Sequence, residues 1–245
     1  MNSERYSKQS VIPEIGDEGQ DILSDSSVLV IGAGGLGTTL LYNLASAGVG
    51  TIGIADHEIV RVPNLNNQFI HFEDDIGSLK VASAAKKLRA YNSMVNIIPH
   101  ATAINRDNAI EVISQYDIVA VAIEDTQAKM IVNEACVELE KPFVEGGING
   151  FAGSLFFVKP HETPCLSCLY GTDFPPEENN GALGSVISTI SSMEATCVIE
   201  YLLGMDVPAA GNLIYYDAKN ATIEKTPIDR SEHCPICGPD HEDRL

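Results

Sequence analysis

The sequence contains no tryptophan, and aromatic residues make up only 6% of its 245 residues. Basic residues are also scarce: 15 lysines and arginines stand against 34 acidic residues, and the formal net charge is −19. A surface this acidic repels nucleic acid and anionic membranes, so we expect neither as a partner. A site for any anionic ligand in this chain must therefore depend on a few local cations and on helix N-termini.

Long apolar stretches are missing as well. No run approaches the roughly 20 residues of a membrane span, and the first twenty residues lack the apolar segment of a signal peptide. We therefore expect a cytoplasmic protein. Apolar residues (44%) and charged residues (20%) are balanced as in globular proteins, and the length allows one large α/β domain or two small ones.

A glycine-rich stretch, SVLVIGAGGLG, covers residues 27–37. Its apolar start predicts a buried strand, and its glycines fit the pattern G-x-G-x-x-G ahead of a helix over about 36–47. Such glycines let the backbone approach a phosphate, and the helix start offers free N–H groups to it. A carboxylate at the end of the next strand can bind ribose hydroxyls. The expected nucleotide site, which fits NAD as well as ATP, comprises Gly32, Gly34, Gly35, Leu36, Gly37 and Asp56.

Strands and helices are predicted to alternate through the first 150 residues. Continuous apolar strands and intervening helices favour a Rossmann-like, mostly parallel sheet covered by helices. The helix expected over 78–91 carries Leu79, Ala82, Ala85 and Leu88 on the side predicted to be buried. The predicted strands are 27–31, 49–56, 95–100, 117–123 and 141–147, and the other helix is 126–139.

The pattern changes after Gly150. A strand over 151–160 follows another strand directly, residues 186–203 form a helix with many small residues, and 212–228 form an antiparallel hairpin. We therefore expect a C-terminal antiparallel extension. The interpretation is one domain over 1–245, with an N-terminal arm (1–26), a nucleotide-binding half (27–150) and a substrate-facing, zinc-binding half (151–245).

The connection over residues 57–77 is long and without periodicity, which is typical of functional loops. Asn64, Asn67 and Gln68 lie in it, and Lys80 follows at the start of a helix, where a positive charge opposes the helix dipole. A bound polyphosphate would relieve that conflict, and this favours ATP over NAD. The alternative is a solvated lysine with amides that cap the loop.

Two carboxylates, Glu124 and Asp125, end the fourth strand on the same sheet edge. Oxygen ligands of this kind suit Mg²⁺, whereas an aspartate just before a helix also suits an N-cap. We favour Glu124 for the metal and Asp125 for the cap, and both count among the expected cofactor-binding residues.

Four of the six cysteines form two C-x-x-C pairs, Cys165 with Cys168 and Cys234 with Cys237. In an intracellular protein this spacing favours a tetrahedral, structural Zn²⁺ site over disulfides, and a redox pair is the alternative. The remaining two, Cys136 and Cys197, lie in apolar helical patterns and are expected in the core.

Together these motifs resemble the ThiF/MoeB/HesA group, relatives of the ubiquitin-activating E1 enzymes. The similarity covers nearly the whole chain. It includes the start Arg5-Tyr6-x-Lys8-Gln9, the glycines, ASAGVG (45–50), Asp56, Asn64-Leu65 with Gln68, Gly77 with Lys80, PCxxC, YDA (216–218) and the final CPxCG.

The resemblance implies a homodimer that binds MgATP and attacks its α-phosphate with a carboxylate, giving an acyl-adenylate and pyrophosphate. It implies that Asp56 binds ribose, that Lys80 and the amides at 64, 67 and 68 bind phosphates, and that Glu124 holds Mg²⁺. Lys8 corresponds to an arginine that reaches into the partner subunit's site. The candidate catalytic residues are therefore Lys80, Asn67, Lys8 and Glu124.

Several positions depart from the group. An arginine is replaced by Asn67, another by Lys8, and an aspartate by Glu124, so the phosphate site is less positive than usual and Arg61 is the candidate to compensate. The loop over 171–184, which its composition predicts to be mobile, has no cysteine near Asn180, where ThiF- and MoeB-like sequences carry one. We therefore expect no thioester or persulfide step on this chain.

The expected function is adenylation of a carboxylate that a separate thiol-bearing protein then accepts. A small molecule such as the pyridinol precursor of the [Fe]-hydrogenase cofactor suits the absent cysteine. The C-terminal glycine of a ubiquitin-like sulfur carrier is the alternative, as is a non-catalytic nucleotide-binding scaffold. An NAD-dependent oxidoreductase lacks an obvious acid–base pair here, and the net charge weighs against a tRNA-modifying relative.

Overall fold

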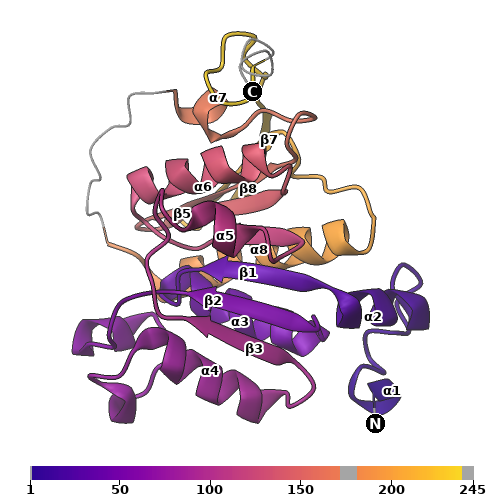
Figure 1. Cartoon of the computed structure of the whole chain (residues 1–245), viewed down its shortest axis with the longest axis vertical. Coiled ribbons are helices and arrows are strands. Elements are labelled where there is room, and N and C mark those ends of the chain that lie inside the picture. The colour runs from indigo at the N-terminus through magenta and orange to yellow at the C-terminus, as the bar shows by residue number, and fades with distance from the viewer. Residues whose placement is uncertain (1, 172–180, 239–245) are drawn as a thin grey trace.

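The computed structural model describes residues 2–171 and 181–238, and an eight-stranded sheet runs through it (Figure 1). The strand order is β3-β2-β1-β4-β5-β6-β7-β8. The first five strands along the chain are parallel, as the apolar pattern predicted. They are β1 (Ser27–Ile31), β2 (Thr51–Ala55), β3 (Asn96–His100), β4 (Ile118–Val121) and β5 (Phe143–Asn149).

The last three strands form the expected antiparallel extension. Gly150 has a φ of +59°, which glycine adopts without strain, and the chain reverses there so that β6 (Ala152–Val158) pairs antiparallel with β5. β7 (Asn212–Asp217) and β8 (Thr222–Pro227) form the predicted hairpin and close the sheet at its other edge. The predicted mixed α/β architecture is therefore confirmed.

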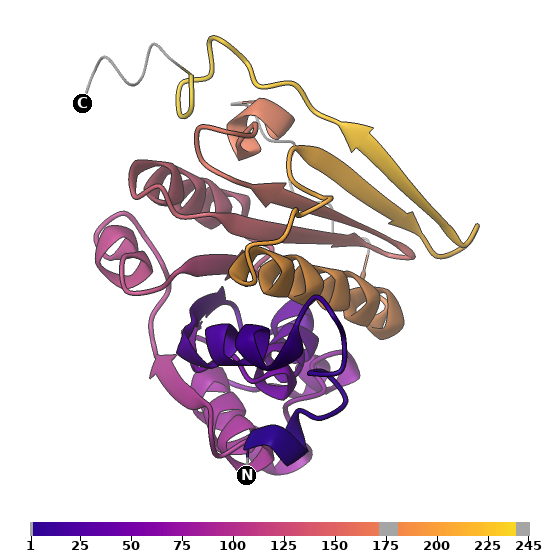
Figure 2. The ribbon, with the colours of Figure 1, turned by 90° about the vertical axis from the view of Figure 1, so that its right-hand side faces the viewer.

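Helices cover both faces of the sheet because its central strands are apolar on both sides. In β1, Val28 and Val30 pack into one core, and Leu29 and Ile31 pack into the other. Figure 2 shows the two helical layers on either side of the sheet. One layer contains α2 (Gly16–Asp25), α3 (Gly35–Ala47), α4 (Lys80–Tyr91) and α8 (Gly184–Leu202), and the other contains α5 (Ala109–Ile113), α6 (Thr126–Glu138) and α7 (Leu166–Tyr170).

The small residues of α8 allow the close packing that its sequence predicted. Its hydroxyls contact α3, with Ser188 Oγ 3.2 Å from Thr39 Oγ1. On the sheet side, a Cβ added at Gly153 would lie 2.4 Å from Ile190 Cγ1, so only glycine fits there. This packing fixes the start of α8 beside the start of α3.

Some local predictions were wrong. The helix predicted over 78–91 begins at Lys80, because Leu79 is extended and pairs with Ile59. Of the four side chains predicted to share its buried side, Ala85 and Leu88 are buried, whereas Leu79 and Ala82 are exposed. The side chains that pack into the core are Val81, Ala84, Ala85 and Leu88. The sequence also gave no signal for the short elements α1 (Asn2–Arg5), η1 (Val62–Asn66), η2 (Glu73–Asp75), α5 and α7.

No helix within residues 2–171 and 181–238 is long and apolar enough to cross a membrane. The position of the absent loop cysteine, near Asn180, and the acidic C-terminal tail lie outside the described residues.

Candidate active site

The glycine turn lies where β1 ends and α3 begins, at the carboxyl edge of the parallel strands. Gly32 has a φ of +105°, and a Cβ there would lie 2.3 Å from the Ala122 carbonyl oxygen. A Cβ on Gly37 would lie 2.0 Å from the Gly32 carbonyl oxygen. The N-cap, Gly34, has no side chain to accept a hydrogen bond from α3, and the Leu36 side chain packs into the core. The first N–H groups of α3 are therefore suited to bind an anion.

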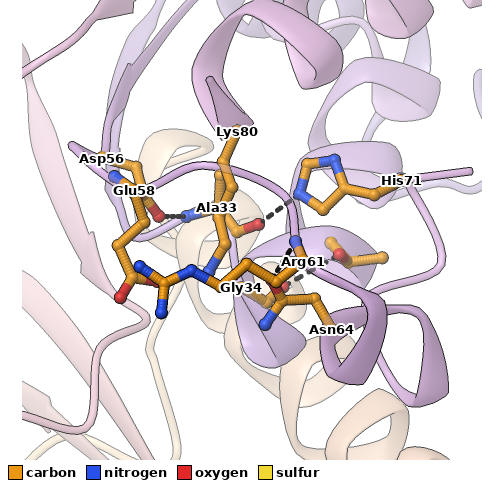
Figure 3. A network of polar contacts seen from close by, with 9 residues as sticks. Ala33, Gly34, Asp56, Glu58, Arg61, Asn64, His71 and Lys80 are labelled. Atoms are coloured by element: carbon orange, nitrogen blue, oxygen red, sulfur yellow. Dashed lines mark hydrogen bonds and ion pairs between the residues drawn. The ribbon is translucent and has the colours of Figure 1, made fainter. Parts of the chain in front are cut away.

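Asp56 connects this turn to the following loop (Figure 3). Its Oδ2 accepts a hydrogen bond from the Ala33 N–H at 2.8 Å, and its Oδ1 accepts one from the Glu58 N–H at 2.8 Å. Each carboxylate oxygen has two lone pairs, so both can still accept a ribose hydroxyl. Asp56 thus lies beside the glycine turn, as the sequence predicted.

Lys80 is almost fully buried, with 3% of its surface exposed, although it carries the charge that the site needs. Its Nζ lies 2.5 Å from Glu58 Oε2. This hydrogen bond with Lys80 lowers the pKa of Glu58, which favours its ionised carboxylate. Lys80 is also the first residue of α4, where its charge opposes the helix dipole, as expected.

His71 links the glycine turn to α4 and was not identified from the sequence. Its Nε2 is 2.9 Å from the Ala33 carbonyl oxygen, and its Nδ1 is 2.8 Å from Ser83 Oγ. Since a carbonyl only accepts, Nε2 carries the hydrogen and Nδ1 accepts from the serine. Burial lowers the pKa of His71, which favours this neutral form.

Two hydrogen-bonded routes therefore join the glycine turn to α4. One passes from Ala33 through Asp56 and Glu58 to Lys80, and the other passes through His71 to Ser83. Glu58 was also missed by sequence reasoning. Its position two residues after Asp56, in the same long connection, was the only signal that could have identified it.

The three amides lie around the same turn. Asn64 Oδ1 accepts a hydrogen bond from the Arg61 N–H at 2.8 Å and so caps η1. Asn67 lies beside Gly35, its Cγ 3.9 Å from the point where a Cβ on that glycine would stand. Gln68 is next to Gly34, and its Oε1 is buried without a hydrogen-bond partner among the described residues. A buried acceptor without a donor is costly, so this amide is ready to receive a ligand hydroxyl or to turn its N–H groups toward a phosphate.

The two carboxylates after β4 have different roles. Asp125 is the N-cap of α6: its Oδ1 accepts a hydrogen bond from the Ala128 N–H at 2.8 Å. Glu124 is exposed at the same sheet edge as the glycine turn. The capping interpretation thus holds for Asp125, and the assignment of Glu124 to Mg²⁺ stays a prediction.

Lys8 lies at the opposite end of the parallel strands, near the C-terminal end of α3. The neighbouring Tyr6 packs against Gly48, which ends α3, and its hydroxyl accepts a hydrogen bond from Asn92 Nδ2 at 2.8 Å. Because α3 has 13 residues, its two ends are about 20 Å apart. The structure therefore places Asp56, Asn67 and Gln68 around the glycine turn but Lys8 far from that turn of its own chain.

The four paired cysteines form one cluster, with all sulfurs within 4.8 Å of one another. Cys165 Sγ is 3.6 Å from Cys234 Sγ, and Cys168 Sγ is 3.5 Å from Cys237 Sγ. A tetrahedral Zn²⁺ with Zn–S bonds of about 2.3 Å requires sulfurs about 3.8 Å apart, so the donor set fits zinc. The other two cysteines, Cys136 and Cys197, are buried in the two cores as expected.

The model of the ThiF family matches residues 6–236. The chain belongs to the ThiF family. It is 36% identical over 246 residues to the sulfur carrier protein adenylyltransferase of Thermus thermophilus, covering 96% of this chain and 90% of the relative. It is 38% identical over 240 residues to adenylyltransferase and sulfurtransferase MOCS3 of Arabidopsis thaliana, covering 96% of this chain and 52% of the relative. The present chain thus spans about half the length of MOCS3.

Solved structures agree on the fold. The Escherichia coli MccB structure with MccA-N7isoASN has a TM-score of 0.85 at 23% identity, covering 96% of this chain and 75% of that chain. PaaA has a TM-score of 0.79 at 21% identity, covering 92% and 73%. As a ThiF family member with these relatives, the chain is an E1-like, ATP-using adenylyltransferase, as the sequence predicted.

Proposed function

We propose that this enzyme adenylates a carboxylate without a covalent step on its own chain. The observation that carries the proposal is the hydrogen-bonded network at the carboxyl edge of the sheet, which holds the glycine turn, Asp56 and Lys80 together. These are the groups that a nucleotide needs for its phosphates and its ribose.

In the proposed reaction a carboxylate oxygen attacks the α-phosphorus of ATP. A new P–O bond forms, the bond to the β-phosphate oxygen breaks, and pyrophosphate leaves. Lys80, Asn67 and the N–H groups of α3 stabilise the charge that develops on the phosphates, and Asn64 and Gln68 orient them. Mg²⁺, bound with the help of Glu124, would neutralise part of the phosphate charge. An ionised carboxylate needs no general base.

The cysteine inventory supports the absence of a thioester. The chain has six cysteines. Four form the metal-type cluster, and the other two, Cys136 and Cys197, are 0% and 7% exposed. Burial raises the pKa of the Cys197 thiol to about 12, so it is a poor nucleophile. The activated acyl group must then pass to a separate acceptor, for which we propose a thiol-bearing protein.

The carboxylate itself has two candidates. The missing thiol suits a small molecule, such as the pyridinol precursor of the [Fe]-hydrogenase cofactor. The second candidate is the C-terminal glycine of a ubiquitin-like sulfur carrier, because the similar Thermus thermophilus protein is named for a sulfur carrier substrate.

We further propose that the whole chain works as one adenylation domain within a homodimer, in which the partner subunit's copy of Lys8 completes the ATP site. The position of Lys8 at the far end of α3 supports this arrangement. Mixing a Lys8→Ala variant with a Lys80→Met variant tests it. Mixed dimers regain one complete site and so recover part of the activity, whereas sites built within one chain would give no recovery.

Carboxylate-dependent exchange of labelled pyrophosphate into ATP tests the proposed function. We expect exchange with one candidate carboxylate, and loss of it in Lys80→Met. ATP binding without exchange for every candidate would instead favour a nucleotide-binding scaffold. Unchanged ATP affinity in Lys80→Met would show that the phosphate site itself is not functional.

A further inference from the structure

The pairing of Lys80 with Glu58 raises a question that the proposed reaction does not answer. A buried ammonium at the start of a helix is costly unless an anion is close. That anion is already present, because Glu58 Oε2 lies 2.5 Å from Nζ. The group expected to bind phosphate is therefore engaged by a carboxylate of its own chain.

Backbone hydrogen bonds keep Lys80 and Glu58 next to each other. The Lys80 N–H donates to the Glu58 carbonyl oxygen at 2.9 Å, and the Glu58 N–H donates to Asp56 Oδ1 at 2.8 Å. The two side chains differ in exposure: that of Lys80 is 4% exposed, and that of Glu58 is 53% exposed. The lysine is thus fixed inside the site, whereas the carboxylate has room to move away.

A second positive group, Arg61, faces Glu58 from the same loop. It acts on the Glu58 carboxylate electrostatically, and Figure 3 shows the Arg61 side chain extending toward it. A carboxylate that leaves Lys80 therefore still has a cationic neighbour. The same Arg61 is the residue expected to compensate for the arginine absent at position 67.

We propose that Glu58 is a positioning residue that acts as the resident counter-ion of Lys80 and competes with the ATP phosphates for it. In the free enzyme it pairs with the buried ammonium and holds it in the site. When ATP binds, the phosphates take over Lys80, and Glu58 turns toward Arg61. This inference rests on the proposed function, and it predicts that the carboxylate weakens ATP binding.

Glu58→Gln tests the idea because the amide oxygen still accepts the Lys80 hydrogen bond while the negative charge is gone. Titration calorimetry with MgATP should show about fivefold tighter binding, the effect of one unit charge at close range in a water-exposed site. The KM for ATP should fall with it. Glu73→Gln on η2 is the matched control, since it removes an exposed charge without contact to Lys80, and its affinity should equal that of wild type.

A structural role alone would destabilise the free and the ATP-bound enzyme equally and leave the affinity unchanged. Unchanged or weaker binding in Glu58→Gln, with Lys80→Met still impaired, overturns the inference and leaves the proposed function intact. Unchanged binding in Lys80→Met overturns both. If Glu58→Gln does not fold, the same titration with Glu58→Ala takes its place and should also show tighter ATP binding, because the competing carboxylate is gone. Wild-type affinity in that variant contradicts the inference.

Discussion

His71 shows how one side chain can hold a phosphate loop and a lysine-bearing helix together. It is 4% exposed and bonded at both ring nitrogens, to Ala33 on one side and to Ser83 on the other. Burial lowers the pKa of His71 most, and the charges of Lys80 and Lys87 on α4 lower it further. The hydrogen bond to Ala33 and the charge of Asp75 act in the opposite direction. The imidazole is therefore a neutral connector.

Its titration gives the first prediction. Because the folded-state pKa of His71 lies below 6.5, its contribution to stability is intact above that pH and is lost as the pH falls through the folded-state value. His71→Gln keeps one donor for the Ala33 carbonyl but cannot be protonated. We expect this variant to lose about 1 kcal/mol of unfolding free energy at pH 8, because one hydrogen bond is lost. The difference from wild type should disappear as the pH falls.

Urea unfolding of both proteins between pH 8 and pH 5 measures this gap. A stability difference that stays constant over the whole range would mean that folding does not lower the pKa of His71.

Glu194 gives a second prediction at the same scale. It is fully buried, neither of its oxygens has a hydrogen-bond partner among the described residues, and its carboxyl lies against Gly146 of β5. Burial raises its pKa, and the nearby charge of Glu145 raises it further. A raised folded-state pKa costs nothing below the ordinary value and destabilises the fold as the pH rises toward it.

Replacing the acid should remove that penalty. Relative to wild type, Glu194→Gln should gain about 1.4 kcal/mol of stability for each pH unit above 4.5, until the folded-state pKa of the glutamate is reached. Thermal unfolding between pH 4.5 and pH 8 shows the trend. The exposed Glu138→Gln is the control and should show none. A pH-independent difference in Glu194→Gln would mean that this group ionises normally.

At the scale of elements, the β1–α3 junction depends on one glycine more than on its neighbour. A Cβ on Gly37 would collide with the Gly32 carbonyl oxygen, whereas a Cβ on Gly34 would lie at an ordinary 3.6 Å from Gln68 Nε2. We expect Gly37→Ala to cost about 2–3 kcal/mol, and Gly34→Ala to stay within about 1 kcal/mol. Chemical unfolding distinguishes them. Equal losses in both variants would contradict the close approach of helix and strand.

The long elements could be predicted from the sequence because burial dictates their pattern. The VLVI run of β1 is apolar on both faces because helices cover both, and the change after Gly150 marked the antiparallel strands. Short elements such as η1 have too few residues for any periodicity to emerge. The start of α4 was misjudged because Leu79 pairs with Ile59, a contact that only the folded loop creates.

The candidate site was predictable in part for the same reason. Strand ends meet at one sheet edge, so Asp56 and the glycine turn could be placed together from sequence alone. The contacts of Glu58 and His71 depend on how the 57–77 connection folds back onto α4, and no local pattern encodes that path. The position of Lys8 at the far end of α3 likewise depends on the course of the N-terminal arm.

At the scale of the molecule, the cysteine cluster ties the C-terminal segment to α7. Its pairs lie 69 residues apart in sequence, so a metal there closes a long loop. We propose one Zn²⁺ per chain. Its removal by a chelator should lower the unfolding midpoint on the order of 10 °C, because metal binding contributes directly to folding.

Elemental analysis and calorimetry of Cys234→Ser test this site. The variant should lose both the metal and the stability, while the core variant Cys197→Ala should keep its zinc. Full metal content in Cys234→Ser would contradict a four-thiolate site.

The central claim, attack of a carboxylate on the α-phosphorus, is tested most directly by following oxygen. The candidate carboxylate is labelled with ¹⁸O and incubated with the enzyme, ATP and an acceptor nucleophile. The mass of the released AMP is then measured by mass spectrometry. We predict AMP that carries one ¹⁸O from the carboxylate, and none when Lys80→Met is used. Unlabelled AMP, or formation of ADP and phosphate in its place, would contradict the account.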